Sequence, residues 1–326
     1  KIREGIRGVL CCLAFLLTQP MRLTTLRELR LLEPPQPGRG AFLSAASGLV
    51  RVGSRFCVVA DDELQLGMFP VTGDTPGTLI RMIDGELPDD TEARKKVKQD
   101  FEALTMLPPT SHYPRGALLA LGSGSKKRRR GGVWLPLNEQ DVADATTARQ
   151  IDATRLFETI GKEIDDVNIE GALVQDGKLV LLHRGNKRHA VNAILSMDLR
   201  AVLRSIEHDS EIGHVPLVSV RHYDLGSTEG VPLGFTDGTA LPDGRIVFST
   251  VAEDSSDSYS DGACVAAAIG VLDSQGRLQS LNLLDDCPKV EGIHAQPEDC
   301  SFRLWCVTDA DDPGVPAALL TVRFPD

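Results

Sequence analysis

A short phrase recurs five times along the chain, and this repetition restricts the fold more than any other feature. In each copy an acidic or hydroxyl residue, usually beside a glycine or another small residue, opens an apolar run. The copies read ASGLV (46–50), FEALT (101–105), IEGAL (169–173), TDGTA (236–240) and VEGIH (290–294). The polar anchors are Ser47, Glu102, Glu170, Asp237 and Glu291, spaced by 55, 68, 67 and 54 residues. Self-similarity of this kind indicates a chain built from repeated supersecondary units.

Each unit contains the same series of short β-strands. From residue 23 onward, runs rich in Val, Leu and Ile are separated by Gly, Asp, Asn or Pro, which is typical of an all-β chain. Four such runs follow each of the first four anchors, whereas three follow Glu291. The segment LTTLRELRLL (23–32) can supply the missing strand. We therefore predict a five-bladed β-propeller with four antiparallel strands per blade, closed by the N-terminal strand; a six-bladed ring is the alternative.

Local signals complete the assignment of strands. The segments VQDGKLVLL (174–182) and LPDGRIVFS (241–249) contain Asp-Gly pairs, which are a strong signal for a β-hairpin. We assign TRLFETI (154–160) as the fourth strand of the second blade. A helical turn is expected within 91–104, and a loop of the third blade is expected over 205–216.

The anchors open the first strand of every blade, and in a propeller these strands line the central channel. The anchors then form a ring around the axis, in which four carboxylates repel one another and raise each other's pKa. A bound cation relieves this repulsion, and all-oxygen ligands favour Ca²⁺ over Mg²⁺. We therefore predict a calcium site formed by Ser47, Glu102, Glu170, Asp237 and Glu291. In the alternative interpretation the anchors bind backbone amides without a metal, and Thr236 could also take the place of Asp237.

A run of basic residues follows a predicted second strand. The loop GSGSKKRRR (122–130) lacks the spacing of a Walker motif, but it combines a Gly/Ser backbone with basic side chains. Backbone amides and guanidinium groups together favour phosphate. We expect Lys126, Arg128 and Arg184 to bind phosphate; a solvated hairpin loop is the alternative.

Acidic residues at the ends of other second strands are candidates for catalysis. Asp61 or Glu253 could act as a general base toward a water molecule held at the channel mouth. The alternative for each is the capping of a turn, which is the common role of an acidic residue near glycine.

The net charge excludes some classes of ligand. The chain has 326 residues, with 35 Lys and Arg against 46 Asp and Glu, and its formal net charge is −11. Nucleic-acid binding requires a basic surface, so we expect no nucleic-acid partner. No apolar run reaches the roughly 18 residues of a membrane-spanning helix. We expect a small-molecule ligand, with phosphorylated compounds included, and we make no prediction for a protein partner.

The first 20 residues are set apart from the folded unit. A basic start followed by the apolar stretch GVLCCLAFLLT (8–18) is typical of a secretory signal, but no small-x-small cleavage site follows. The alternative is that residues 1–20 are upstream or artefactual sequence. In both interpretations a single propeller domain spans residues 21–326. The cysteines contain no C-x-x-C pair and favour a reducing compartment, hence a cytoplasmic protein. A secreted or periplasmic protein follows if the leader is a genuine signal.

Two families share these features. The Ser–Glu–Glu–(Thr/Asp)–Glu ring and the phrases GFTD (234–237) and KVEGI (289–293) resemble the soluble calcium-activated nucleotidase (apyrase) family. That resemblance implies a five-bladed propeller with one axial Ca²⁺ that hydrolyses nucleoside di- and triphosphates. Over most of residues 40–326, the phrases KQDFEAL, ALGSGS, NIEGA and VTDADDP resemble an uncharacterised group of bacterial propellers with a domain of unknown function. This second resemblance implies a fold but no activity.

Three hypotheses for function follow. The first is a Ca²⁺-dependent propeller hydrolase of phosphoanhydrides or phosphoesters, in which the ring holds the ion and an acidic residue at the mouth positions water. The second is a non-enzymatic binding module with a structural axial cation. The third is a lactonase-like or esterase-like propeller, which rests on analogy with other propellers alone.

Overall fold

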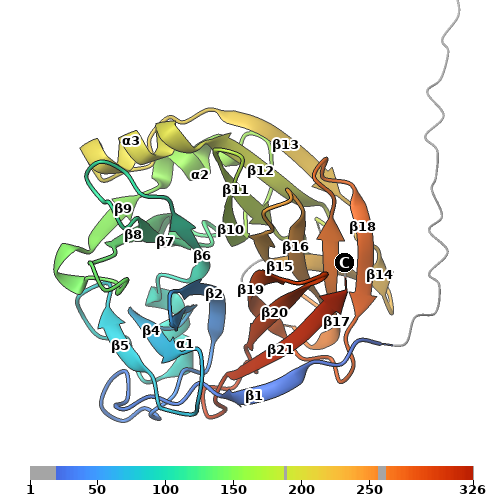
Figure 1. Cartoon of the computed structure of the whole chain (residues 1–326), viewed down its shortest axis with the longest axis horizontal. Helices are drawn as coiled ribbons and strands as arrows, with labels where there is room; N and C mark the ends of the chain where they lie inside the picture. Colours follow the sequence, from blue (N-terminus) through green and yellow to red (C-terminus); the bar gives the residue numbers. More distant parts are fainter. Residues whose placement is uncertain (1–19, 187–188, 256–261, 326) are drawn as a thin grey trace, which may run out of the picture.

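The computed structural model describes residues 20–186, 189–255 and 262–325, and it confirms the predicted five-bladed β-propeller. Five antiparallel sheets surround a central axis, and the first strand of each blade is innermost (Figure 1). Each of these first strands contacts the first strands of both neighbouring blades, so the ring is closed. Residues 1–19 of the predicted leader lie outside the described residues.

The strands of each blade follow chain order from the axis outward, apart from the strand that closes the ring. Blade 1 contains β2 (Ala46–Val52), β3 (Arg55–Ala60), β4 (Gln65–Pro70) and β5 (Thr78–Arg81). Blade 2 contains β6 (Phe101–Leu107), β7 (Ala117–Gly122), β8 (Gly131–Pro136) and β9 (Arg149–Asp152). Blade 3 contains β10 (Ile169–Gln175), β11 (Lys178–His183), β12 (Asn192–Asp198) and β13 (Leu217–Tyr223).

The last two blades include the exceptions to the simple order. Blade 4 contains β15 (Val231–Ala240), β16 (Ile246–Glu253), β17 (Cys264–Leu272) and β18 (Leu278–Leu283), and the short β14 (Ser227–Thr228) pairs with the start of β15. Blade 5 contains β19 (Val290–Glu298), β20 (Ser301–Thr308) and β21 (Ala318–Pro325), completed by β1 (Thr24–Glu28). The pairing of β1 with β21 confirms that the N-terminal strand supplies the missing fourth strand.

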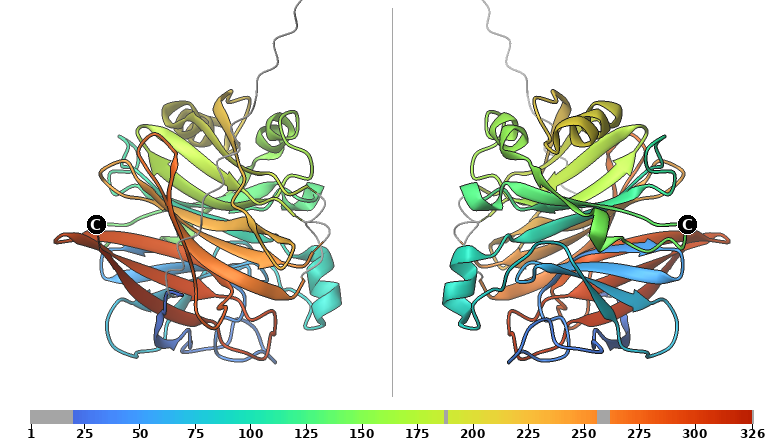
Figure 2. Two further views of the ribbon diagram at one scale, coloured as in Figure 1. Left: turned by 90° about the vertical axis from the view of Figure 1, so that its right-hand side faces the viewer. Right: turned by 90° about the vertical axis from the view of Figure 1, so that its left-hand side faces the viewer.

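Short helices lie outside the sheets. They are α1 (Thr91–Val97), α2 (Thr154–Ile160) and α3 (Leu199–Asp209), together with the 3₁₀ turns η1 (Lys127–Arg129) and η2 (Ala145–Thr147). Helix α1 lies at one face of the ring, whereas α2 and α3 lie along its rim beside blade 3 (Figures 1 and 2). Within the described part of the chain, no helix has the length and apolar character needed to cross a membrane.

Helix α1 is the helical turn predicted within 91–104, but two other assignments were wrong. TRLFETI forms α2, and β9 is the fourth strand of blade 2. Residues 205–209, expected in a loop, belong to α3. In α2 the buried residues Leu156, Phe157 and Ile160 recur at the spacing of a helix face, which a seven-residue apolar run does not distinguish from a strand.

Five apolar clusters form the core, one between each pair of neighbouring blades. Successive side chains of a strand point to opposite faces, so consecutive residues of a second strand enter different clusters. In β7, Leu119 and Leu121 pack against blade 3, whereas Leu118 and Ala120 pack against blade 1. Because both faces are buried, most second strands contain a run of consecutive apolar residues rather than an alternating pattern, such as FCVVA in β3 and LVLL in β11.

A β-bulge interrupts the pairing of every inner strand at an equivalent position. The bulged residues are Ser47, Glu102, Glu170, Thr236 and Glu291. A bulge inserts one residue that has no partner in the ladder and re-aims its side chain. The repeated phrase of the sequence therefore marks a repeated break in strand pairing next to the axis.

Glycines follow several of these bulges because the inner strands approach one another closely there. A Cβ atom on Gly171 would lie 2.9 Å from the Cα of Asp237, and a Cβ atom on Gly292 would lie 2.9 Å from the Cα of Gly48. These neighbours are backbone atoms, so the rotation of a side chain does not relieve such contacts. The absence of a side chain at these positions lets the five inner strands meet around the axis.

We predict that Gly171→Ala lowers the free energy of unfolding by about 1–3 kcal/mol, because the added methyl group overpacks the axis. The matched control is Gly131→Ala, whose Cβ would meet no atom closer than the carbonyl oxygen of Ile151 at 3.5 Å. The control should change the free energy of unfolding by about 0.5 kcal/mol or less. Urea unfolding followed by tryptophan fluorescence measures both, and equal losses would contradict crowding at the axis.

Candidate functional site

One end of the central channel contains a cavity of about 160 Å³. Its walls come from the loops that lead into the inner strands and from the loops that leave the second strands. The two strands are antiparallel, so one begins where the other ends and both sets of loops lie on the same face of the ring. Ten acidic and six basic side chains are among the described residues that line the cavity, so negative charge is in excess when all are ionised.

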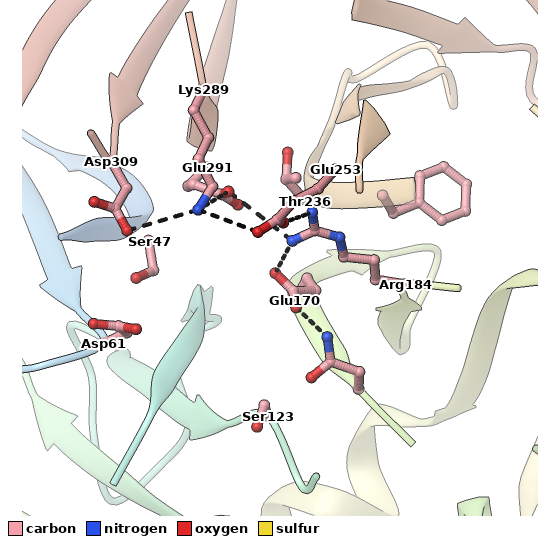
Figure 3. Close-up of polar contacts among 12 residues, drawn as sticks. Ser47, Asp61, Ser123, Glu170, Arg184, Thr236, Glu253, Lys289, Glu291 and Asp309 are labelled. Atoms are coloured by element: carbon pink, nitrogen blue, oxygen red, sulfur yellow. Dashed lines mark hydrogen bonds and ion pairs between the residues drawn. The ribbon is translucent and has the colours of Figure 1, made fainter. Parts of the chain in front are cut away.

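Four of the five predicted ring residues line this cavity, namely Ser47, Glu102, Glu170 and Glu291. The equivalent position in blade 4 belongs to Thr236, which is the bulged residue of β15 (Figure 3). Its Oγ1 lies 2.8 Å from the hydroxyl oxygen of Ser249 and 2.7 Å from the carbonyl oxygen of Val290. The Thr236 hydroxyl is therefore already hydrogen-bonded within the protein.

Asp237 connects two blades instead of joining the ring. Its Oδ1 accepts a hydrogen bond from the backbone N–H of Gly238 at 2.7 Å, and its Oδ2 accepts one from Ile293 in β19 at 2.8 Å. The side chain is buried and does not line the cavity. Burial raises the pKa of Asp237 well above its ordinary value, although the two N–H donors act in the opposite direction. Thr236, the alternative noted from the sequence, occupies the ring position.

Two basic side chains neutralise the carboxylates on one side of the cavity (Figure 3). Arg184 forms a close ion pair with Glu253 and lies 3.6 Å from Glu170 and 4.0 Å from Glu291. The Nζ atom of Lys289 lies 3.5 Å from Glu291 and 4.0 Å from Glu253. Burial alone would lower the pKa of both basic groups, but the surrounding carboxylates outweigh it and hold each pKa above its ordinary value. Both groups therefore remain cations.

Three carboxylates converge on another side of the cavity. One oxygen atom each of Asp61, Asp100 and Glu102 lies within 4.8 Å of the other two. The Nζ atom of Lys98 pairs closely with Asp61 and lies 3.1 Å from Asp100, while Arg129 lies 2.7 Å from Asp100. Glu102 makes no hydrogen bond or ion pair with the residues that the structure describes. Its carboxylate is therefore the least compensated of the three.

The pKa values of the cavity carboxyl groups reflect their burial and their uneven pairing with basic residues. Burial, with smaller effects of Asp100 and Glu170, raises the pKa of Glu102 well above its ordinary value. Burial raises the pKa of Asp61 to about 6, although Lys98 acts against it. Burial likewise raises the pKa of Glu170 to about 8, with Arg184 opposing the shift. The cavity thus holds carboxyl groups that would bind protons or another cation more readily than carboxyl groups in water.

Of the three residues predicted to bind phosphate, Arg184 alone lines the cavity. Lys126 and Arg128 are exposed at the start of η1, where Arg128 donates a hydrogen bond to the carbonyl oxygen of Lys95 at 3.0 Å. The buried member of the basic run is Arg129. Its guanidinium serves as a counter-charge to the acidic cluster rather than as a free phosphate ligand.

The two predicted general bases both line the cavity, but on different sides (Figure 3). Glu253 has both oxygen atoms engaged, because Oε1 accepts a hydrogen bond from the backbone N–H of Gly262 at 2.7 Å and Oε2 contacts Arg184. Asp61 keeps 18% of its side-chain surface exposed and pairs with Lys98. Of the two, Asp61 is the more available for proton transfer.

The sequence interpretation missed Asp100, a further carboxylate of the acidic cluster. It also missed the basic residues that compensate the carboxylates around the cavity, which are Lys98, Arg129 and Lys289. A signal was present, since Lys98 and Lys289 lie four and two residues before the anchors Glu102 and Glu291. Buried carboxylates require nearby cations, and the chain supplies them just before its inner strands. That requirement favours a search for basic residues next to each anchor.

We predict that Glu102→Gln raises the melting temperature in excess EDTA at about pH 8, and that the gain vanishes near pH 4. The pKa of Glu102 is higher in the folded state than the value of about 4.3 expected for an unfolded chain. The folded state therefore binds more protons, and the unmodified protein loses stability as the pH rises above that value. Glutamine removes the ionisation and hence the loss.

Thermal melts of both proteins across this pH range measure the effect. Glu298→Gln is the control, because Arg303 and Arg323 lower the pKa of the partly exposed Glu298, so its neutralisation should give no gain. A gain for Glu102→Gln that is independent of pH would contradict the electrostatic explanation.

Comparisons with known proteins identify the family of the chain. A model of DUF6929, a family of unknown function, matches residues 42–324, and no curated protein matches. Among solved structures the chain is similar to a luciferin-regenerating enzyme (10% identity, TM-score 0.46, 93% of this chain and 94% of that chain). It is also similar to Myxococcus xanthus glutaminyl cyclase (12%, 0.46, 94% and 100%) and to Kuenenia stuttgartiensis hydrazine synthase (11%, 0.38, 85% of this chain but 59% of that chain). Because the family model covers most of its length, the chain belongs to the DUF6929 family.

Proposed function

We propose that the axial cavity binds a divalent metal ion, Ca²⁺ in preference to Mg²⁺, through Asp61, Asp100 and Glu102. The observation that carries the proposal is the separation of their oxygen atoms, one from each residue, by no more than 4.8 Å. Ca²⁺ binds oxygen at about 2.3–2.6 Å, so two ligands of one ion are at most about 5 Å apart. The cluster therefore has the dimensions of a site for a single hard cation.

The charge of the cavity supports the same proposal. Glu102 has no hydrogen-bonding partner among the described residues. Acidic side chains outnumber basic ones around the cavity. A divalent ion would offset the burial, and the smaller repulsion from neighbouring carboxylates, that hold the pKa of Glu102 high.

The proposed site includes only one residue of the ring predicted from the sequence. Glu170 and Glu291 face Arg184 and Lys289, and these cations would repel a metal ion on their side of the cavity. On the proposed side, the ammonium group of Lys98 competes with the ion for Asp61 and Asp100. Binding is therefore expected to displace Lys98 from part of the cluster, which limits the affinity.

We predict that Ca²⁺, added to the full chain after EDTA treatment, raises the melting temperature more than Mg²⁺ does. Ligand binding to the folded state stabilises it by about 2.7 kcal/mol at a hundredfold excess over the dissociation constant. Glu102→Gln should lose the response to Ca²⁺, because the amide removes one anionic ligand. Differential scanning calorimetry across a Ca²⁺ titration measures both effects.

The variant Glu298→Gln, at a residue that does not line the cavity, is the control and should keep the full response. A Glu102→Gln protein that responds like the unmodified chain would place the ion elsewhere. An unmodified chain with no response would show that Lys98 and Arg129 suffice as counter-charges, and it would overturn the metal site.

A hydrolase is the second candidate, and the cavity favours a neutral ester or lactone over a phosphorylated substrate. Lys126 and Arg128 do not line the cavity, and Arg184 is held among carboxylates. A phosphate group would enter a site with excess negative charge and meet no uncommitted cation from the predicted set. The phosphoester and phosphoanhydride chemistry implied by the nucleotidase resemblance therefore has less support than ester chemistry.

Asp61 is the residue best placed to act as the base in such a reaction. In the metal-free protein its pKa of about 6 leaves it ionised at neutral pH and more basic than an ordinary aspartate. A metal ion bound at the cluster would supply Lewis acidity toward a carbonyl oxygen. In the metal-free protein the ion pair with Lys98 holds the carboxylate of Asp61 in place. In the loaded site the ion would take over this role as Lys98 is displaced.

We predict that, with Ca²⁺ present, a panel of neutral lactones and aryl esters contains a substrate whose hydrolysis rate rises with pH around a midpoint below about 6, because the bound ion lowers the pKa of Asp61 from its metal-free value. Asp61→Asn should abolish the activity, whereas Glu298→Gln should retain it. Phosphate release from nucleotides would instead restore the phosphohydrolase hypothesis. Calcium binding without turnover on either panel would favour the non-enzymatic binding module.

A further inference from the structure

Two cysteines lie side by side at the boundary between blades 4 and 5. Cys264 begins β17, and Cys287 lies in the linker between β18 and β19. Their Sγ atoms are 3.1 Å apart, and both residues are free and partly exposed. They are 23 positions apart in the sequence, so the tertiary fold rather than local chain geometry brings the two sulfur atoms together.

We propose that Cys264 and Cys287 form a reversible disulfide that fastens this linker to blade 4. A disulfide requires sulfur atoms about 2.05 Å apart, so the pair needs an approach of about 1 Å. The oxidant is a low-molecular-weight disulfide such as oxidised glutathione. One protein thiolate attacks it and releases one thiol, and the second protein thiolate then attacks the mixed disulfide and releases another. Two electrons pass to the oxidant, and its two sulfur atoms take up the two protons that the cysteines lose.

The other described cysteines do not offer this chemistry. Cys57 and Cys306 are fully buried in apolar clusters. Cys300 is exposed at the turn between β19 and β20, and no other described sulfur atom lies within bonding contact of it. The pair thus combines access to a soluble oxidant with a sulfur neighbour for the second step.

The disulfide would restrain the linker that contributes Lys289 to the wall of the axial cavity. Lys289 follows Cys287 by two residues, and its Nζ atom lies 2.6 Å from Asp311 and 3.5 Å from Glu291. The linker backbone is unusual, because Asp286 and Cys287 both have left-handed dihedral angles, with φ of 57° and 43°. A covalent link at Cys287 would restrict the backbone that positions the Lys289 ammonium group.

Oxidation of the full chain in EDTA tests the proposal without any dependence on metal binding. After treatment with oxidised glutathione, peptide mapping under non-reducing conditions should show one intramolecular link between Cys264 and Cys287, which dithiothreitol removes. The melting temperature should rise on the order of 5 °C, because the link closes a loop in the unfolded chain. Amide hydrogen exchange over residues 284–291 should slow.

Three variants make the result specific. Cys264→Ser and Cys287→Ser should each abolish the link and the slower exchange, whereas Cys300→Ser should retain both. A glutathione adduct that persists on either cysteine of the pair, or a link that includes Cys300, would overturn the proposal. A link that forms without any change in exchange over 284–291 would overturn the fastening of the linker.

Discussion

Closure of the ring by β1 is the constraint on which the other features depend. Thr24 and Glu28 pair with Thr321 and Ala318 of β21, so strands from opposite ends of the chain complete blade 5. Without this pairing, β21 would present an open edge, and the apolar cluster between blades 5 and 1 would lose Leu29 and Leu31. The five bulged residues face one another only when the inner strands form a closed ring. The axial cavity is therefore a product of the whole chain rather than of any single blade.

The cavity combines buried carboxylates with buried basic groups, and either kind without the other would destabilise the folded protein. Buried carboxylates repel one another, and buried basic groups lose hydration, but the two kinds together reduce both costs. The compensation is uneven: Arg184 and Lys289 surround Glu170, Glu253 and Glu291, whereas Glu102 has only the more distant charge of Lys98. The ring has approximate fivefold geometry, but its charge is distributed asymmetrically, with the least compensated carboxylate at Glu102. A cationic ligand would therefore lie on that side, away from the centre of the ring.

The features that could be predicted from the sequence are the ones that repeat. Blade number, strand order and closure follow from local apolar runs and a recurring phrase, and the structure confirms them. Four of the predicted ring residues line the cavity for the same reason, since a bulge at an equivalent place re-aims each of them. At the fifth place two polar residues are adjacent, and the hydrogen bonds that select Thr236 over Asp237 come from another blade. The counter-charges Lys98 and Lys289 were missed because they lie in loops outside the repeated phrase. Helix α2 was missed because its apolar run is too short to reveal a helical period.

Consecutive side chains of a second strand pack into two different clusters, and this limits where the chain can gain or lose residues. A single residue inserted into β7 would exchange Leu118 and Leu119 between the clusters on either side, and so disturb two blade interfaces at once. Segments that pack only at the rim carry no such penalty. The anchor spacings agree with this division: the 68- and 67-residue units contain α2 and α3, while the 55- and 54-residue units lack a rim helix. The inner half of each blade therefore behaves as a part of fixed length, and the rim is where the fold can gain new segments without reopening the ring.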